Sequence, residues 1–269
     1  MTSQDYVHGY SEVEATRLAD QAGTLAELLH HDTEYPAGSR VLEAGCGVGA
    51  QTRILARRSP AARFVSVDVS AASLALARAA LATEGLTNVE FQRADLFALP
   101  FADACFDHVF VCFVLEHLRQ PENALPSLLR VLRPGGSLTV IEGDHGSAFF
   151  HPKSARAQRT IECLNQAQAA AGGDALIGRR LYPLLRAAGL DDVQVSPRFV
   201  YADRSRPGWV DGFTRKTFIA MVEGAAESAR RLGLIDQAAW DEGIADLKRS
   251  AENDGTFCYT FFKAVARKG

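Results

Sequence analysis

The sequence has no apolar run of about 18 residues, so it predicts no membrane-spanning helix. Residues 1–6 offer neither a basic start nor an apolar stretch, and a secretion signal is therefore not expected. The five cysteines are scattered and form no C-x-x-C pair, which argues against a metal site and against a structural disulfide. Together these absences predict a cytoplasmic protein with reduced thiols.

An excess of positive charge is missing as well. The chain has 29 basic and 32 acidic residues, a net charge of −3, so no overall field attracts nucleic acid or an anionic membrane. With 47% hydrophobic residues in a length of 269, the chain can build a packed globular core. We expect a small molecule as the partner, and assembly into a homo-oligomer stays open.

One glycine-rich stretch organises the chain: residues 40–52 read RVLEAGCGVGAQT. A short apolar strand leads to Glu43, then to a turn containing Gly45, Gly47 and Gly49, and then to a helix start. Glycines let backbone N–H groups approach a ligand closely, because no Cβ atom stands in the way. A strand that enters a helix through such a turn is typical of nucleotide-type cofactor sites in doubly wound α/β folds.

Asp68 strengthens this interpretation. It ends the next expected strand, residues 64–68, and lies 21 positions after Gly47, where this fold places an acid that accepts from ribose hydroxyls. The glycine spacing is G-x-G-x-G, so the third glycine comes one residue early for the dinucleotide fingerprint G-x-G-x-x-G. The pattern favours a nucleotide-like cofactor without making it a dinucleotide.

Strands and helices alternate regularly through the first half of the chain, which predicts a parallel sheet with right-handed crossovers. Further helices and two more strands follow. The expected strands are 41–42, 64–68, 89–91, 106–113, 137–141, 193–200 and 256–265, and the expected helices are 12–30, 50–58, 71–83, 122–132, 154–171, 177–188, 209–232 and 237–251.

We therefore predict an α/β protein with a Rossmann-like, doubly wound, mostly parallel sheet of about seven strands and helices on both faces. Residues 142–147 are expected to form a polar turn at the carboxyl end of the fifth strand. Residues 203–253 are too long for a loop, so we predict a helical cap inserted before the last strand. No domain boundary is evident, and residues 1–269 are predicted to form a single domain.

A set of short motifs resembles the class I S-adenosylmethionine-dependent methyltransferases, in the branch that contains quinone-biosynthesis and natural-product tailoring enzymes. The resemblance covers about residues 38–145, and the motifs are specific only jointly. They are residues 41–49, Asp68, Ala94-Asp95-Leu96, Leu99-Pro100-Phe101 with Phe106-Asp107, Phe113 with Glu116-His117, and Leu132-Arg133-Pro134-Gly135-Gly136.

The resemblance implies S-adenosyl-L-methionine as the cofactor and S-adenosyl-L-homocysteine as its product. It implies that Asp68 binds the ribose hydroxyls, with Val69 beside the adenine. It also implies that Asp95 accepts from the adenine amino group while Leu96 packs on the ring. Glu43 is expected to meet the amino group of the methionine part, directly or through water. The other residues implied at the methionine end are Gly45, Gly47, Cys112, Phe113 and His117.

In similar enzymes the N-terminal segment folds over the site as a lid. The resemblance implies the same role here for residues 1–36, with Tyr10 and Gln21 as contacts to the cofactor. The histidine pair His30–His31 is better explained by covering the end of a helix than by binding a metal. We expect no metal site.

Simpler roles compete with some of these assignments. Asp68 and Asp95 stand at chain turns, where an aspartate often caps a helix, and both roles can coexist. Cys46 has no base beside it in the sequence and is expected to pack rather than to react. Phe113 could equally belong to the core.

Methyl transfer requires an in-line nucleophile and exclusion of water, and it requires a base only when the acceptor retains a proton. His145 is the candidate base, because it follows a central strand and histidine titrates near neutral pH. The alternative is a hydrogen bond within its own turn. Weaker candidates are His117, Glu142 and Asp144, and residues that either shape an acceptor pocket or simply pack are Arg179, Tyr182, Trp209, Phe213 and Phe218.

Several acceptor classes lack their motifs. Residues 111–114 read VCFV, where amino-methylating enzymes of nucleic acids carry an Asn/Asp-Pro-Pro-aromatic motif. A Pro-Cys nucleophile for cytosine and a thiol cluster for arsenic are also missing. We predict methyl transfer to a small aromatic or heteroaromatic metabolite, such as an indole or a phenol. Quinone-type C-methylation is the alternative, and an NAD(P)-dependent oxidoreductase or a non-catalytic cofactor-binding sensor are alternatives of other classes.

Overall fold

The computed structural model describes residues 12–269, and their side chains from residue 21 onward. Seven strands form one sheet in the order β3-β2-β1-β4-β5-β7-β6. The first five strands are parallel, and β7 is antiparallel to both of its neighbours. The predicted α/β class with a mostly parallel sheet is confirmed. The strands are β1 (Arg40–Ala44), β2 (Arg63–Asp68), β3 (Val89–Arg93), β4 (Phe106–Cys112), β5 (Leu132–His151), β6 (Leu190–Ala202) and β7 (Thr256–Lys268).

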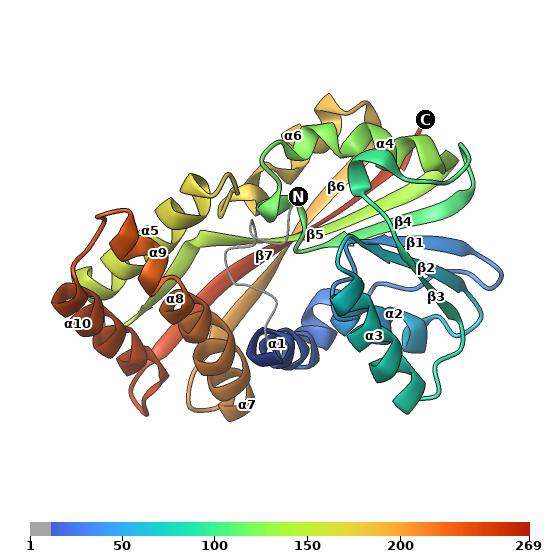
Figure 1. Ribbon diagram of the computed structural model, residues 1–269. Coiled ribbons are helices and arrows are strands. Elements are labelled where there is room, and N and C mark those ends of the chain that lie inside the picture. The colour runs from blue at the N-terminus through green and yellow to red at the C-terminus, as the bar shows by residue number, and fades with distance from the viewer. Residues whose placement is uncertain (1–11) are drawn as a thin grey trace.

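Helices cover both faces of the sheet, with α4 and α6 on one side and α1, α2 and α3 on the other (Figure 1). Side-chain caps start several of them: Ser70, Ser154 and Asp236 each accept from the backbone N–H three residues later. The α-helices are α1 (Glu12–His30), α2 (Ala50–Arg58), α3 (Ala71–Thr83), α4 (Leu125–Val131), α5 (Ala155–Ala170), α6 (Leu181–Ala187), α7 (Pro207–Trp209), α8 (Ala220–Gly224), α9 (Ala226–Arg231) and α10 (Gln237–Lys248). Element η5 (Val210–Ile219) is a π-helix. The short 3-10 helices are η1 (Leu96–Ala98), η2 (Leu115–His117), η3 (Pro121–Asn123), η4 (Ile177–Arg180) and η6 (Arg249–Ala251).

The central strand β4 is buried on both faces, as its near-continuous apolar sequence predicts. Val109 and Val111 belong to a core shared with α4 and α6. Phe110 and Cys112 point to the opposite face, into a core that includes residues of α1, α2 and α5. The two cores hold the carboxyl ends of the parallel strands in fixed positions.

One sequence prediction is wrong at β5. Residues 142–147 do not form a turn that ends the strand, because β5 continues to His151 and is 20 residues long. The antiparallel strand β7 supplies the backbone partners for this extension, pairing Glu142 with Phe262 and Phe149 with Cys258. The ladder is irregular between these two pairs, and there the Ser147 hydroxyl accepts from the Thr260 backbone N–H at 2.9 Å.

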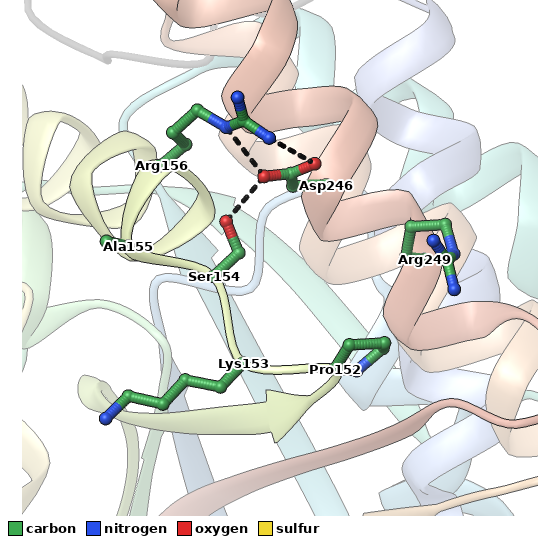
Figure 2. Close-up of a pocket in the computed structure, with 7 residues that line it drawn as sticks. All are labelled: Pro152, Lys153, Ser154, Ala155, Arg156, Asp246 and Arg249. Atoms are coloured by element: carbon green, nitrogen blue, oxygen red, sulfur yellow. Dashed lines mark hydrogen bonds and ion pairs between the residues drawn. The ribbon is translucent and has the colours of Figure 1, made fainter.

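Helices α5, α8, α9 and α10 gather around the end of the sheet at which β5 and β7 extend beyond the parallel strands (Figure 1). Helix α5 is fastened to α10 where the Ser154 hydroxyl and the Arg156 guanidinium both donate to Asp246, at 2.6 and 2.9 Å (Figure 2). A surface groove at this junction is lined by Pro152, Lys153, Ser154, Ala155, Arg156, Asp246 and Arg249. None of the predicted site residues lines that groove.

The close contact between α5 and α10 requires a glycine at position 243. A Cβ atom there would collide with the hydroxyl of the buried Thr160 and lie 2.9 Å from the Arg156 carbonyl oxygen. Gly243→Ala should therefore lower the free energy of unfolding by about 1–3 kcal/mol, measured by urea denaturation. Gly224→Ala in α8 is the matched control, because a Cβ atom meets nothing there and alanine favours a helix by up to about 1 kcal/mol. Equal stability of the two variants would contradict this account of the contact.

Candidate active site

The candidate site lies where the strand order reverses, between β1 and β4. In open α/β sheets ligands bind in the crevice outside the carboxyl ends of the strands at such a switch point. The register pairs Ala44 at the end of β1 with Val67 on one side and with Val111 on the other. Glu43, Asp68 and Phe113 therefore meet at one edge of the sheet, although they are far apart in the sequence.

The glycine turn after β1 needs its glycines for backbone and packing reasons. Gly45 has a φ of 79°, and a Cβ atom there would lie 2.5 Å from Val114 Cγ2. Gly49, with a φ of 78°, lies against Ala77 of α3 in the same way. A Cβ atom at Gly47 would meet no protein atom within 4 Å, so Gly47 is the glycine of this turn that has space beside it.

Four amides of this turn, those of Gly45, Cys46, Gly47 and Gly49, are already hydrogen-bonded within the protein. The N–H groups of Gly45 and Cys46 donate to the Val67 carbonyl at 2.8 and 2.9 Å. The Gly47 N–H donates to Asp68 Oδ2 at 2.9 Å. A phosphate cradle at a helix start requires N–H groups that point at the ligand. The turn is therefore better suited to a ligand without a pyrophosphate.

Glu43 is a buried carboxyl at the end of β1, with 2% of its surface exposed. The hydroxyls of Thr52 and Ser66 both donate to its Oε2 atom, each at 2.6 Å. Burial raises the pKa of Glu43 to about 7, and the nearby Asp68 carboxyl adds to the rise, although the two hydroxyls oppose it. Because both donors occupy Oε2, the Oε1 atom is left to accept from a ligand.

Asp68 has a structural role in the turn in addition to its predicted ligand role. Its Oδ2 accepts from the Gly47 N–H, and its Oδ1 accepts from the Ser70 N–H at 2.8 Å. Burial raises the pKa of Asp68, and these backbone N–H groups oppose the shift. Val69 next to it is partly exposed, and its carbonyl accepts from Arg93 at 2.9 Å.

Asp95 follows β3 and caps the short turn η1. Its Oδ1 accepts from the Phe97 N–H at 3.0 Å, so the capping role weighed from the sequence is present. Its side chain is exposed at the edge of the site, whereas Leu96 is buried. An exposed carboxylate beside a buried leucine leaves room for both the capping role and a ligand contact.

The chain turns sharply after β4 at Phe113, which has a φ of 56° although it is not a glycine. Such left-handed backbone in a bulky residue is strained, and strain of this kind concentrates at functional sites. The Phe113 ring lies 5.4 Å from the ring of Phe261. Cys112 before it is buried, and burial raises the pKa of its thiol well above the usual range, so it stays a neutral packing group.

Glu142 on β5 holds the turn that follows Phe113. Its Oε1 accepts from the backbone N–H groups of Val114 and Leu115, at 3.0 and 2.8 Å. Burial raises its pKa well above the usual value, and the neighbouring Glu116 adds to this. The buried Glu142 carboxyl therefore links β5 by hydrogen bonds to the turn that follows β4.

His145 lies on β5, deep in the structure, with 5% of its surface exposed. Its Nδ1 atom is 2.7 Å from the hydroxyl of Tyr259 on β7. Its Nε2 atom is 3.9 Å from Glu116 Oε2, and the other oxygen of Glu116 lies 3.5 Å from His117 Nε2. Two predicted histidines thus meet at one carboxylate, to which the sequence analysis assigned no role.

The residues expected around an acceptor divide into three groups. Arg179 forms a two-pronged ion pair with Asp144, at 2.7 and 2.8 Å, which commits both side chains to each other. Phe213 and Phe218 are buried against the aromatic side chains of β7, and Phe218 meets the His145 ring edge-on at 6.3 Å. The remaining two, Tyr182 and Trp209, are exposed and partly buried respectively.

The predicted N-terminal contacts are only partly described. Gln21 on α1 is buried, with 8% of its surface exposed, whereas Tyr10 lies outside the described residues. His30 is buried and its Nε2 contacts Gln51 at 2.7 Å, while His31 contacts Arg198, so the pair does not converge. Among the side chains that the structure describes, those of residues 21–269, no group of His, Cys, Asp and Glu is placed to hold a metal ion. No helix among residues 12–269 is long and apolar enough to cross a membrane.

Tyr259 and Glu116 are the members of the site that sequence reasoning missed. Tyr259 lies 114 residues after His145, and only the antiparallel pairing of β7 with β5 brings them together. Alternation along β7 indicates that Tyr259 shares a face with Phe257 and Phe261, but it does not indicate what lies opposite. Glu116 lies next to His117 in a motif that the sequence analysis did quote.

Known proteins resemble the first half of this chain. Residues 42–140 match the family described as "Methyltransferase domain". Over 126 residues the chain is 35% identical to Methyltransferase GfsG of Streptomyces halstedii, which covers 46% of this chain and 45% of that protein. Over 107 residues it is 40% identical to the ubiquinone/menaquinone biosynthesis C-methyltransferase UbiE of Stutzerimonas stutzeri, covering 39% and 42% respectively.

The matched stretch spans less than half the length of each of these relatives. A solved structure, that of the cyclase SpnF, superposes with a TM-score of 0.54 at 24% identity and covers 93% of this chain and 81% of its own. At that identity the likeness shows the fold alone. The sequence motifs, the switch-point geometry and the family match all fall on the same residues, and residues 42–140 of this chain therefore resemble a methyltransferase domain.

Proposed function

We propose that this protein transfers a methyl group from S-adenosyl-L-methionine to a small organic acceptor. The observation that carries the proposal is the pair of carboxyls, Glu43 and Asp68, beside a glycine turn whose amides donate within the protein. Carboxyls suit the ammonium and ribose hydroxyls of this cofactor, which has no phosphate. NAD(P) has a pyrophosphate that calls for free amides, so the oxidoreductase alternative is disfavoured.

The residues present fit this cofactor. Glu43 Oε1 is open to the cofactor's ammonium, and a cation there would offset the cost of ionising a buried carboxyl. Asp68 and Asp95 would hold the ribose and adenine, with Leu96 and Val69 against the ring. When bound, S-adenosylmethionine supplies a methyl group on a sulfonium, which is electrophilic without help from the protein. The chain's own task is to place the acceptor in line and to exclude water.

The acceptor side of the site lies around Phe113, Phe218 and His145. The His145 imidazole and the Glu116 carboxylate, 3.9 Å apart, form the centre that receives the acceptor's proton. The aromatic residues beside them favour a flat aromatic or heteroaromatic acceptor, a phenol or an indole. Helix α1, with Gln21, and the helices of residues 207–251 would close the site as lid and cap.

Quinone-type C-methylation is the second candidate, favoured by the 40% identity to UbiE over 107 residues. A demethylated quinol and a phenol both present an acidic hydroxyl beside an electron-rich ring carbon. They differ in the atom that is methylated, and mass spectrometry with fragmentation of the product distinguishes the two outcomes.

The direct test has two stages. S-adenosylmethionine or S-adenosylhomocysteine at about 100 times Kd should stabilise the protein by about 3 kcal/mol in thermal melts, and NAD⁺ should have no effect. A panel of phenols, indoles and demethylated quinols should then yield S-adenosylhomocysteine with at least one acceptor class. Stabilisation by NAD⁺ alone would contradict the proposal, and stabilisation without turnover on any acceptor would favour the sensor alternative.

Asp68→Ala should weaken cofactor binding and also destabilise the fold. The Gly47 and Ser70 amides would lose their acceptor, which costs about 1–3 kcal/mol of unfolding free energy. The exposed Asp95 is the comparison: Asp95→Ala should cost at most about 1 kcal/mol through its cap. Calorimetric binding and urea denaturation on both variants measure the two effects, and unchanged affinity in Asp68→Ala would remove Asp68 from the site.

Cofactor affinity should depend on the ionisation of Glu43. Its pKa of about 7 means that the carboxyl is mostly neutral below that pH and charged above it. An ammonium near it favours the charged form, so binding below pH 7 releases a proton, and affinity rises as the pH passes upward through 7, by up to about tenfold. Titration calorimetry in buffers of different ionisation enthalpy counts that proton.

Glu43→Gln is the matched variant, because an amide keeps the shape of the side chain and cannot ionise. It should bind more weakly and lose this pH dependence. The same variant should gain stability relative to the parent as the pH rises from about 4.5 to 7, because the parent's folded pKa is raised and its stability falls over that window. A parent protein with flat affinity across pH 7 would show that the ammonium lies elsewhere.

A further inference from the structure

Phe218 of the π-helix η5 packs edge-on against the imidazole of His145. The two ring centroids are 6.3 Å apart, and the ring planes meet at 90°. Phe218 also packs on Phe257 and Tyr259 of β7, with centroid distances of 4.7 and 5.5 Å, and 1% of its surface is exposed. Because close-packed rings surround it, the Phe218 side chain forms a fixed boundary on one side of His145.

Phe213 in the same helix offers a direct comparison. It is equally buried, with 1% of its surface exposed. Its ring lies 5.5 Å from Tyr259, 5.6 Å from Phe261 and 6.1 Å from Phe257, all of them on β7. Phe213 therefore belongs to the packing between η5 and the sheet, whereas Phe218 contacts the His145 ring in addition to β7.

A threonine hydroxyl stabilises the π-helical register that places Phe218 there. Thr217 Oγ1 donates to the Gly212 carbonyl oxygen at 2.8 Å, and both residues are buried. In an α-helix a threonine hydroxyl bonds to the carbonyl three or four residues before it. The bond of Thr217 spans five residues, which is the spacing of the backbone hydrogen bonds in a π-helix. It therefore favours the π register over the α register at this point of the chain.

We propose that Phe218 is a specificity-determining residue that limits the size of the acceptor, and that Thr217 is a positioning residue that keeps Phe218 against His145. The inference rests on the proposed function. An acceptor whose proton passes to the centre formed by His145 and Glu116 must lie within hydrogen-bond reach of that centre. It therefore lies beside the imidazole, in the space that Phe218 closes on one side.

This boundary narrows the class of acceptor. A fixed aromatic side chain beside His145 accommodates a single flat ring and excludes a second ring fused to it on that side. Protein interiors yield little to an oversized group, because the surrounding side chains are close-packed. Of the acceptors proposed above, a phenol is therefore favoured over an indole or a fused-ring quinol.

Binding of one-ring and two-ring probes tests the size limit without turnover. Protein saturated with S-adenosylhomocysteine is titrated by calorimetry with phenol and with 2-naphthol, and the ratio of the two affinities is compared among variants. Phe218→Leu should raise the affinity for 2-naphthol relative to phenol by about tenfold or more. Phe213→Leu should leave this ratio at the parent value, although both variants should melt at a lower temperature. Phe218→Ala, which removes the whole ring, should raise the ratio further.

Two substitutions at Thr217 test its positioning role. Valine keeps the shape of the side chain without the hydroxyl, so Thr217→Val should shift the probe ratio as Phe218→Leu does, and Thr217→Ser should restore it. In proton NMR the imidazole signals of His145 are identified among the seven histidines by their loss in His145→Gln. These signals should move in Phe218→Leu and in Thr217→Val, because the neighbouring ring no longer lies edge-on to the imidazole, and Thr217→Ser should keep them in place.

Equal probe ratios in the Phe218 and Phe213 variants would overturn the inference, and so would a parent protein that binds neither probe. A Thr217→Val protein with the parent's ratio and the parent's His145 signals would remove Thr217 from its role. Thermal melts with S-adenosylhomocysteine confirm that each variant is folded and binds the cofactor. A parent that binds phenol in preference to 2-naphthol and methylates no acceptor would count against the proposed function and not against the size limit.

Discussion

The antiparallel pairing of β7 with β5 is the constraint on which most of this structure depends. Because β7 lies between β5 and β6, both of its edges are paired, and it provides the partner for the long extension of β5. Residues four apart on a strand share a face, so the face that places Tyr259 beside His145 also places the buried Lys263 at the end of α1. The Lys263 ammonium donates to Asp32 and to Thr33 there. Burial lowers the pKa of Lys263, and Asp32 opposes that shift. A single strand thus contacts both the end of the N-terminal helix and His145.

The fold buries several carboxyl side chains at the carboxyl ends of its strands. Glu43, Asp68 and Glu142 all have a raised pKa, and burial is the largest cause in each case. Buried carboxyls cost stability near neutral pH, because their charged forms lose water. Hydroxyls or backbone amides donate to each of them and offset part of this cost. Glu142 has its donors from the turn after β4 and is committed to structure. In both glutamates the donors share one oxygen, Oε2 in Glu43 and Oε1 in Glu142, but the donors of Glu43 are side-chain hydroxyls whereas those of Glu142 are backbone amides.

The sequence predicted the fold of residues 40–141 well, because alternating strands and helices of regular length allow few arrangements. It failed at residues 142–147, where polar and glycine residues indicate a turn but the partner strand β7, more than 100 positions away, continues the ladder. The positions of the residues proposed for the cofactor were predictable because each lies within a few positions of a strand end. Glu43, the glycines and Asp68 are of this kind. The acceptor side was not, because Tyr259 reaches His145 only through tertiary pairing, and Glu116 is one acidic residue among many until its neighbours are known.

The π-helix η5 packs on the aromatic side chains around His145. Residues five apart in an α-helix point about 140° away from each other, whereas the i→i+5 hydrogen bonds of a π-helix bring them to one face. Phe213 and Phe218 are five apart, and both ring centroids lie 5.5 Å from that of Tyr259. An α-helix at residues 210–219 would direct one of the two rings away from β7. The π-helix also approaches α1 so closely that a Cβ atom at Gly212 would collide with Thr24. The unusual helix therefore connects α1 to the aromatic surroundings of His145.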